Sequence, residues 1–320
     1  MRRAGILCLA FCLGGFSASA APTSPAAPPP AASPPQASEA PDLAYGAYQR
    51  GYYLTALAEA QKRLQDNSKD AVAMTLIGVL YDQGYGVKLD HAEAARWYQL
   101  AADLGNREAI FALALDKLTG QGVKKDVSAA AALFSKAAAM NHAGALYNLG
   151  VLAVQNNGVV SDFAKATGFF RRSAELDYPD AAYALALCYR NGKGVPKDDK
   201  LAAQWMKKAA DQDDVSAEVE YAIMQFNGTG VDKDETAAAK LFMKAAAQRN
   251  PVAQDRLARL YATGRGVRKD VIEAMKWHLI ANAAGEKDEW LDSIFDSLTP
   301  EQKVAVETAI RGFKSDVRGN

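Results

Sequence analysis

Small and apolar residues recur along this chain in a helical pattern that repeats every 36 residues. In the first part of each block they lie at positions i, i+4, i+5 and i+8, as for Ala145, Leu149, Gly150 and Ala153. This spacing places them on one face of a helix. In the second part, small residues flank a large one at offsets of three and seven residues, which again predicts a helix with one buried face. Each block is therefore expected to form two helices.

A glycine-rich loop, Gly-x-Gly-Val-x-x-Asp, separates the two predicted helices of each block. Its first glycine ends the first helix in a left-handed conformation, which asparagine tolerates where Asn156 replaces it. Its aspartate is placed to cap the second helix. The second glycine recurs at Gly86, Gly122, Gly158, Gly194, Gly230 and Gly266. The aspartate recurs at Asp90, Asp126, Asp162, Asp198, Asp234 and Asp270.

The repeated block predicts an all-α fold, a right-handed superhelical solenoid of antiparallel helix hairpins. Neighbouring second helices are expected to pack through the large residue of each block. This expected core column is Trp97, Leu133, Phe169, Trp205, Leu241 and Trp277. Cys188 falls in a column of Leu80, Leu152 and Leu260, so we expect a buried apolar cysteine there.

The segments outside the regular blocks have different compositions. Residues 1–20 have a basic start, a short apolar run and the small residues of a cleavage site, which predicts an export signal. Residues 21–41, rich in Pro, Ala and Ser, predict a disordered tether. We expect the solenoid over 42–287, with an atypical first unit at 42–70 and six regular units. The spacing within 288–320 predicts C-terminal capping helices.

Together, these motifs resemble those of Sel1-like repeats, a tetratricopeptide-like family. The loop, the Ala-x-x-Trp with following Ala-Ala that begins at Ala94, and the Ala-x-x-x-Leu-Gly that begins at Ala145 carry the resemblance. It covers about residues 71–285. The resemblance implies a helical scaffold that binds other proteins. Exported members of this kind resemble periplasmic regulators of exopolysaccharide production, which hold the sensor domain of a kinase.

The charge balance argues against a nucleic-acid partner. The chain has 37 basic and 37 acidic residues, and removing Arg2 and Arg3 with the signal leaves a net charge of −2. No basic excess exists to displace counterions from a polyanion or an anionic membrane. We expect no direct membrane insertion after signal cleavage, and a periplasmic or secreted protein.

Residues typical of catalysis or metal binding are sparse. His91, His142 and His278 lack the spacing of metal ligands, and no nucleophile motif or phosphate-binding loop is evident. The Gly-x-Gly pairs follow predicted helices, whereas nucleotide-binding glycines follow strands. We therefore expect no catalytic residues, no metal and no cofactor, and a protein that is not an enzyme.

Candidate binding residues come from the first helix of each block, by analogy with the concave groove of tetratricopeptide proteins. One 36-residue ladder contains Phe111, Tyr147 and Tyr183, and a neighbouring one contains Asn148, Glu220 and Arg256. Aromatic residues and arginine are frequent anchors in protein interfaces. The alternative for the aromatic ladder is packing against the next repeat.

The favoured function at this point is an exported, non-enzymatic scaffold that binds a protein partner in the bacterial envelope. By resemblance, the partner would be a sensor kinase. An envelope-assembly or host-interaction factor is an alternative. Some secreted Sel1-like proteins resemble lactam-binding or peptidoglycan-binding enzymes, but those carry a cysteine pair per repeat. Here Cys188 is the only cysteine after the predicted signal.

Overall fold

The computed structural model describes residues 42–155 and 161–316 and confirms the all-α prediction. Helices are the only regular elements in these ranges, and none of them is both long and apolar enough for a transmembrane span. The chain divides into two compact units, one up to Tyr178 and one from Pro179 onward. The predicted signal, the tether and Asn156 lie outside the described residues.

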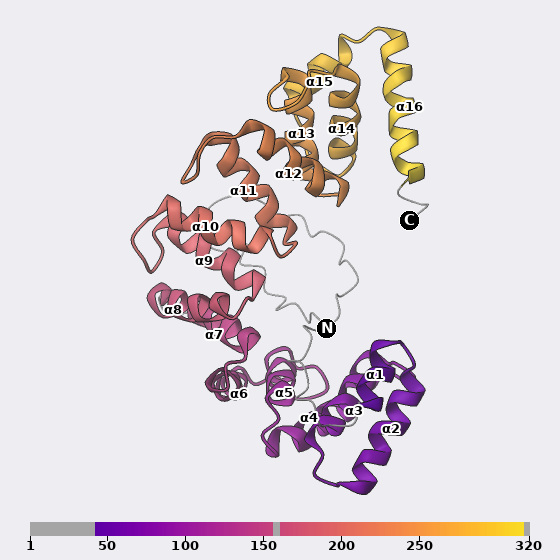
Figure 1. Cartoon of the computed structure of the whole chain (residues 1–320), viewed down its shortest axis with the longest axis vertical. Coiled ribbons are helices and arrows are strands. Elements are labelled where there is room, and N and C mark those ends of the chain that lie inside the picture. Colours follow the sequence, from indigo (N-terminus) through magenta and orange to yellow (C-terminus); the bar gives the residue numbers. More distant parts are fainter. Residues whose placement is uncertain (1–41, 156–160, 317–320) are drawn as a thin grey trace. The chain divides into compact units, whose positions relative to one another are not determined.

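Six helix hairpins, each starting 36 residues after the last, form the repeated part of the chain (Figure 1). Within each unit, every helix of these hairpins packs against the next one along the chain. The first helices are α3 (Ala71–Gln83), α5 (Arg107–Thr119), α7 (Ala143–Gln155), α9 (Pro179–Asn191), α11 (Val215–Asn227) and α13 (Pro251–Thr263). The second helices are α4 (His91–Asp103), α6 (Val127–Ala139), α8 (Phe163–Glu175), α10 (Asp199–Ala210), α12 (Glu235–Ala247) and α14 (Val271–Ala283).

The loop between the two helices of a hairpin has the predicted local chemistry. Each of the six loop aspartates is the N-cap of its second helix, and its carboxylate accepts a hydrogen bond from a backbone N–H in the first turn. Asp90, for example, accepts from the N–H of Glu93 at 2.9 Å. The first loop glycine is left-handed in every described case, with φ of 66° at Gly84 and 76° at Gly264. As expected, the aspartate accepts from a free N–H group at the start of the second helix, and the left-handed glycine ends the first helix.

The second loop glycine has a role that the sequence pattern did not indicate. Gly122 is also left-handed, with φ of 69°, and it lies directly on the backbone of the preceding second helix. A Cβ atom at Gly122 would overlap the carbonyl of His91, and one at Gly230 would overlap the carbonyl of Asp199. Each such loop therefore fits against the first turn of the second helix in the previous hairpin.

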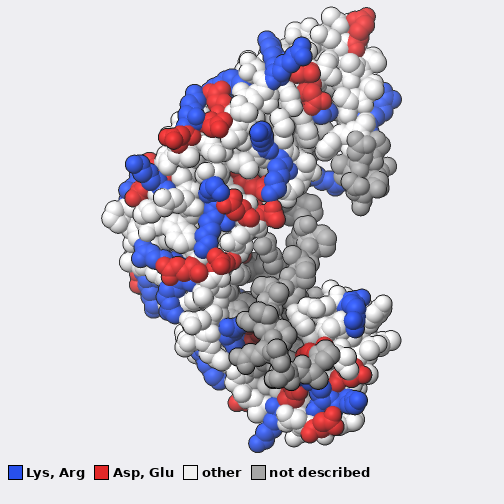
Figure 2. Space-filling model, in the orientation of Figure 1, with Lys and Arg blue, Asp and Glu red and all other residues white. Residues whose placement is uncertain are grey.

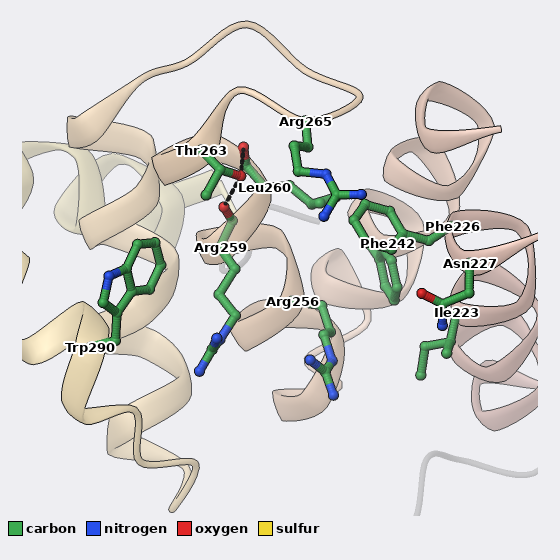
Figure 3. A pocket seen from close by; sticks show the side chains of 10 residues that line it. All are labelled: Ile223, Phe226, Asn227, Phe242, Arg256, Arg259, Leu260, Thr263, Arg265 and Trp290. Atoms are coloured by element: carbon green, nitrogen blue, oxygen red, sulfur yellow. Dashed lines mark hydrogen bonds between the residues drawn. The ribbon is translucent and has the colours of Figure 1, made fainter. Parts of the chain in front are cut away.

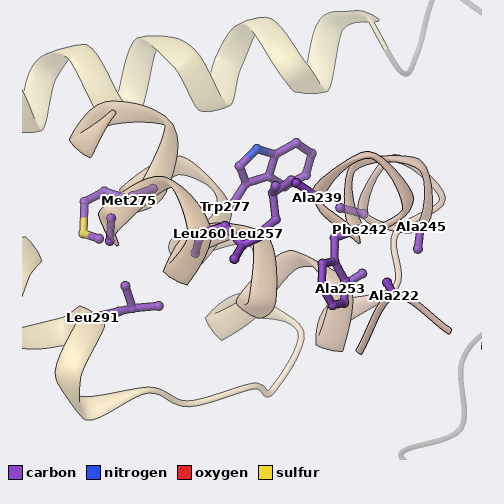
Figure 4. Packing of buried hydrophobic residues seen from close by; sticks show 14 of the residues in the cluster. Ala222, Ala239, Phe242, Ala245, Ala253, Leu257, Leu260, Met275, Trp277 and Leu291 are labelled. Carbon is purple, nitrogen blue, oxygen red and sulfur yellow. The ribbon is translucent and has the colours of Figure 1, made fainter. Parts of the chain in front are cut away.

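The core column of the second helices lies one residue beyond the predicted one. Trp97 and its equivalents are mostly half-buried, whereas the next residue of each helix is nearly inaccessible. The buried column is Tyr98, Phe134, Phe170, Met206, Phe242 and His278. The predicted column instead borders the core: Trp97, Leu133 and Phe169 are partly buried and pack against it, and Trp277, at 7% exposed, belongs to it. Figure 4 shows Phe242, Leu257 and Trp277 packed in the second unit. Cys188 is buried, as predicted.

Additional helices flank the repeats at both ends. In the first unit, α1 (Leu43–Gln49) and α2 (Tyr53–Asp66) precede α3, and α2 packs against it. In the second unit, α15 (Glu289–Asp296) and α16 (Pro300–Asp316) follow α14, and both contact it. Leu291 and Val306 are fully buried in the core of this unit.

The loop contact predicts that two left-handed glycines of the first unit differ in their tolerance of alanine. Gly105→Ala, with φ of 83° and open space around the new Cβ, should cost about 1 kcal/mol from backbone strain alone. Gly122→Ala adds a clash with the His91 carbonyl and should cost about 3 kcal/mol. Urea denaturation of both variants tests this difference. Equal losses of stability would show that the glycine contact does not constrain the stack.

Candidate functional site

The candidate residues of the first unit take part in internal packing. Phe111 is half-buried, and its ring stacks on His142 with 4.1 Å between centroids. Tyr147 is 6% exposed and lies between the rings of Phe170 and Tyr178. Both aromatic rings therefore pack inside the first unit, and these ring contacts are with residues of their own 36-residue block.

Asn148, the third candidate of the first unit, is also buried, at 4% exposed. Its side-chain amide donates a hydrogen bond to the carbonyl of Gly144, one turn earlier in α7, at 2.7 Å. An amide in a buried position is tolerated when it is hydrogen-bonded. This contact gives Asn148 a partner within its own helix.

The candidates of the second unit are more accessible. Glu220 accepts a hydrogen bond from Nη1 of Arg190 at 2.6 Å. Burial, and then the negative charge of Glu220, raise the pKa of the half-buried Tyr183 to about 12, so its hydroxyl stays protonated at neutral pH. Arg256 is exposed and makes no ion pair with the described residues. Of the six candidates, Arg256 is the one that lines the pocket described next.

This pocket, of about 540 Å³, belongs entirely to the second unit. It has apolar walls, three cationic side chains and two neutral polar ones. Its lining comprises Ile223, Phe226 and Asn227 of α11, Phe242 of α12, Arg256, Arg259, Leu260 and Thr263 of α13, Arg265 of the following loop, and Trp290 of α15. Figure 3 shows Trp290 on one side and Phe226 on the other, with Arg256 and Arg259 extending from α13 between them.

Arg259 connects the last hairpin to the C-terminal helices. Its Nε lies 2.5 Å from Oδ2 of Asp288, and its guanidinium lies 5.6 Å from the ring centroid of Trp290. Asp288 is 5% exposed and caps α15 by accepting hydrogen bonds from the backbone N–H groups of Trp290 and Leu291. This arrangement fixes both Arg259 and the Trp290 side of the pocket.

Arg265 is fixed on the opposite side by two different contacts. Its guanidinium lies 4.1 Å from the ring centroid of Phe226, within cation–π range. Its Nη2 also forms a 2.5 Å ion pair with Glu235, which lies outside the pocket lining. Arg265 is therefore oriented before any ligand arrives.

The carboxyl groups of Asp255 and Asp288 both lie near the Arg259 guanidinium, with Oδ2 of Asp255 at 3.8 Å from its Nε. Burial, followed by the negative charge of Asp288, raises the pKa of Asp255 to about 6, and the positive charges of Arg259 and then Arg256 offset the shift only in part. Asp288 already serves as the helix cap. Neither carboxyl group lines the pocket, and guanidinium groups do not release protons at physiological pH. The lining is therefore suited to binding and offers no acid–base pair.

A search of known proteins gives this helical array a family. The Sel1 repeat profile matches six consecutive segments, 71–106, 107–142, 143–178, 179–214, 215–250 and 251–286. The chain belongs to the Sel1 repeat family. Sel1 repeat proteins serve as protein-interaction scaffolds, and their fold is typically non-catalytic.

Solved structures similar to this Sel1 repeat chain include two bacterial proteins. One is a Sel1 repeat protein from Oxalobacter formigenes, with a TM-score of 0.67 and 33% identity, covering 75% of this chain and 98% of that one. The other is c5321, a protective antigen of uropathogenic Escherichia coli, with a TM-score of 0.52 and 25% identity, covering 82% of this chain and 64% of that one. A search of curated proteins found no match.

Sequence reasoning missed Arg259, although the repeat register contained a signal for it. The equivalent residues of the other five Sel1 repeats are all apolar: Val79, Leu115, Val151, Leu187 and Ile223. A single arginine in an apolar column marks a change of environment. Here the change is the end of the repeats, where the column meets α15 in place of another hairpin.

The raised pKa of Asp255 predicts a pH-dependent stability. The folded chain holds this proton up to about pH 6, whereas the unfolded chain releases it near pH 3.8, so stability falls as pH rises through this window. Asp255→Asn removes the penalty and should stabilise the protein by about 1 kcal/mol at pH 7.5 but not at pH 4.

Thermal denaturation at both pH values tests this. The matched control is Asp232→Asn, at an exposed position, which should leave the stability unchanged at pH 4 and at pH 7.5. A parallel loss of stability in the wild type and in Asp255→Asn between pH 4 and pH 7.5 would contradict the assignment.

Proposed function

We propose that this Sel1 repeat protein is an exported, non-enzymatic scaffold that binds a protein partner in the bacterial envelope through the pocket of its second unit. The observation that carries the proposal is the combination of Arg256 with Trp290 in one concavity. Tryptophan and arginine are enriched among the residues that contribute most to protein interfaces. Trp290 is 43% exposed, so its ring is available to a partner.

Export rests on the composition of residues 1–20, and the sensor-kinase identity of the partner rests on family resemblance. A host-interaction factor is a second candidate, favoured by the similarity to c5321, which is described as a protective antigen. Both candidates need the same kind of site, a binding surface for another protein. They differ in whether the partner belongs to the same cell.

Site-specific photo-crosslinking in cells tests protein binding at the pocket. A photoreactive residue at Asn227, an exposed lining position, should give an adduct that contains another protein. Asn191 is the matched control, because it is an exposed asparagine at the equivalent position of an earlier hairpin and does not line the pocket. Arg256→Glu in the Asn227 background should reduce the adduct severalfold.

Mass spectrometry of the adduct separates the outcomes. A membrane sensor protein would support the regulator assignment, and a protein of envelope assembly or of a host would support the alternative. Adducts that contain only cell-wall glycan, or adducts equally strong from Asn191, would refute a protein-binding role for this pocket.

A further inference from the structure

The pocket of the second unit has a net positive lining at the surface of a chain without a basic excess. Three of its lining residues are arginines and none is acidic. The whole chain has 37 basic and 37 acidic residues, and Figure 2 shows both kinds interspersed over the face it draws. The positive charge is therefore local, which suits a short acidic group better than an extended polyanion.

The three guanidinium groups differ in how far their charge is already compensated. Arg259 is paired through Nε with Asp288, and Arg265 is paired with Glu235. Arg256 has no ion pair among the described residues. A guanidinium carries five N–H donors, and a carboxylate can accept two of them side by side. Arg256 is therefore the primary site for an incoming carboxylate.

The paired arginines still contribute to recognition, because they are held in place. Arg259 lies over the Trp290 ring and Arg265 over the Phe226 ring. Side chains that are fixed in the free protein lose less conformational entropy when a ligand binds. Their positive charges also add to the attraction that a carboxylate experiences near Arg256.

The rest of the pocket lining is largely apolar and therefore favours an apolar group of the ligand next to its carboxylate. Ile223 and Phe226 are half-buried and Trp290 is 43% exposed, so apolar surface remains open to a ligand. A volume of about 540 Å³ lies within the range of small-molecule pockets. It accommodates a few side chains of an inserted segment and not a folded surface.

From this geometry we infer that the pocket recognises an acidic peptide segment of the partner, in which an Asp or Glu lies next to a large apolar residue. The carboxylate pairs with Arg256, and the apolar side chain packs between Phe226 and Trp290. This inference rests on the proposed function and names the chemistry of the partner segment. No covalent step is involved.

Selection from a random peptide library displayed on phage, with the full chain as bait, tests the inference without a known partner. We expect the enriched peptides to contain Asp or Glu beside Phe, Trp, Leu or Ile. The synthetic form of an enriched peptide should bind about tenfold more weakly to Arg256→Glu, because a close charge pair becomes a repulsive one. Raising the ionic strength should also weaken its binding.

Arg268→Glu is the matched control. Arg268 is an exposed arginine in the same loop as Arg265, it makes no ion pair with the described residues, and it lies outside the pocket lining. The substitution changes the net charge by the same amount as Arg256→Glu and should leave the affinity unchanged. Thermal denaturation confirms that both variants are folded.

Three results would overturn the inference: enriched peptides without an acidic residue, equal binding to Arg256→Glu and wild type, or no enrichment at all. Neutral peptides that bind and compete with crosslinking at Asn227 would refute acidic recognition while leaving protein binding intact. Failure of the crosslinking experiment would instead refute the proposed function itself. The two failures are therefore distinguishable.

Discussion

The contact between the second loop glycine and the preceding hairpin is the constraint on which the regular part of this structure depends. At Gly122 and Gly230 the backbone of one loop touches the first turn of an earlier second helix, at a distance that leaves no room for a Cβ atom. A positive φ and a close approach coincide at these positions, so glycine alone satisfies both. At these loops the contact sets how one hairpin lies on the hairpin before it, and the loop aspartate then caps the start of the second helix.

The fold could be predicted from the sequence because its determinants are local. The capping of α4 by Asp90 and the left-handed turn at Gly84 each depend on a few neighbouring residues. The core column was harder to predict, because Trp97 and Tyr98 both lie near the inner face of the helix. Which of them is buried depends on how neighbouring helices cross. The crossing angle between neighbouring helices cannot be derived from the repeat spacing. In the structure Tyr98 is the buried residue of the two.

The candidate site was less predictable, because it arises where the repetition ends. The analogy with the tetratricopeptide groove pointed to Tyr147 and Asn148. Both occupy regular repeat positions and are buried by packing within the first unit. Arg256 was found because its side chain suits neither the core nor its column. Arg259 and Trp290 form the pocket only because the last hairpin meets α15, and no spacing within the repeats encodes that encounter.

The glycine contact also bears on how such a chain can change in length. Among the described loops, those of Gly122, Gly230 and Gly266 each lie on the second helix of the hairpin directly before them, so these three junctions use the same pair of surfaces. Duplication or excision of a 36-residue block would join one such surface to another copy of it, and no new interface would have to evolve. The group around Arg259 and Trp290 would be unaffected as long as the block that changes is an earlier one, because Arg259 belongs to the last hairpin and Trp290 to the helix α15 that follows it. The number of repeats and the chemistry of the terminal pocket are thus open to independent variation.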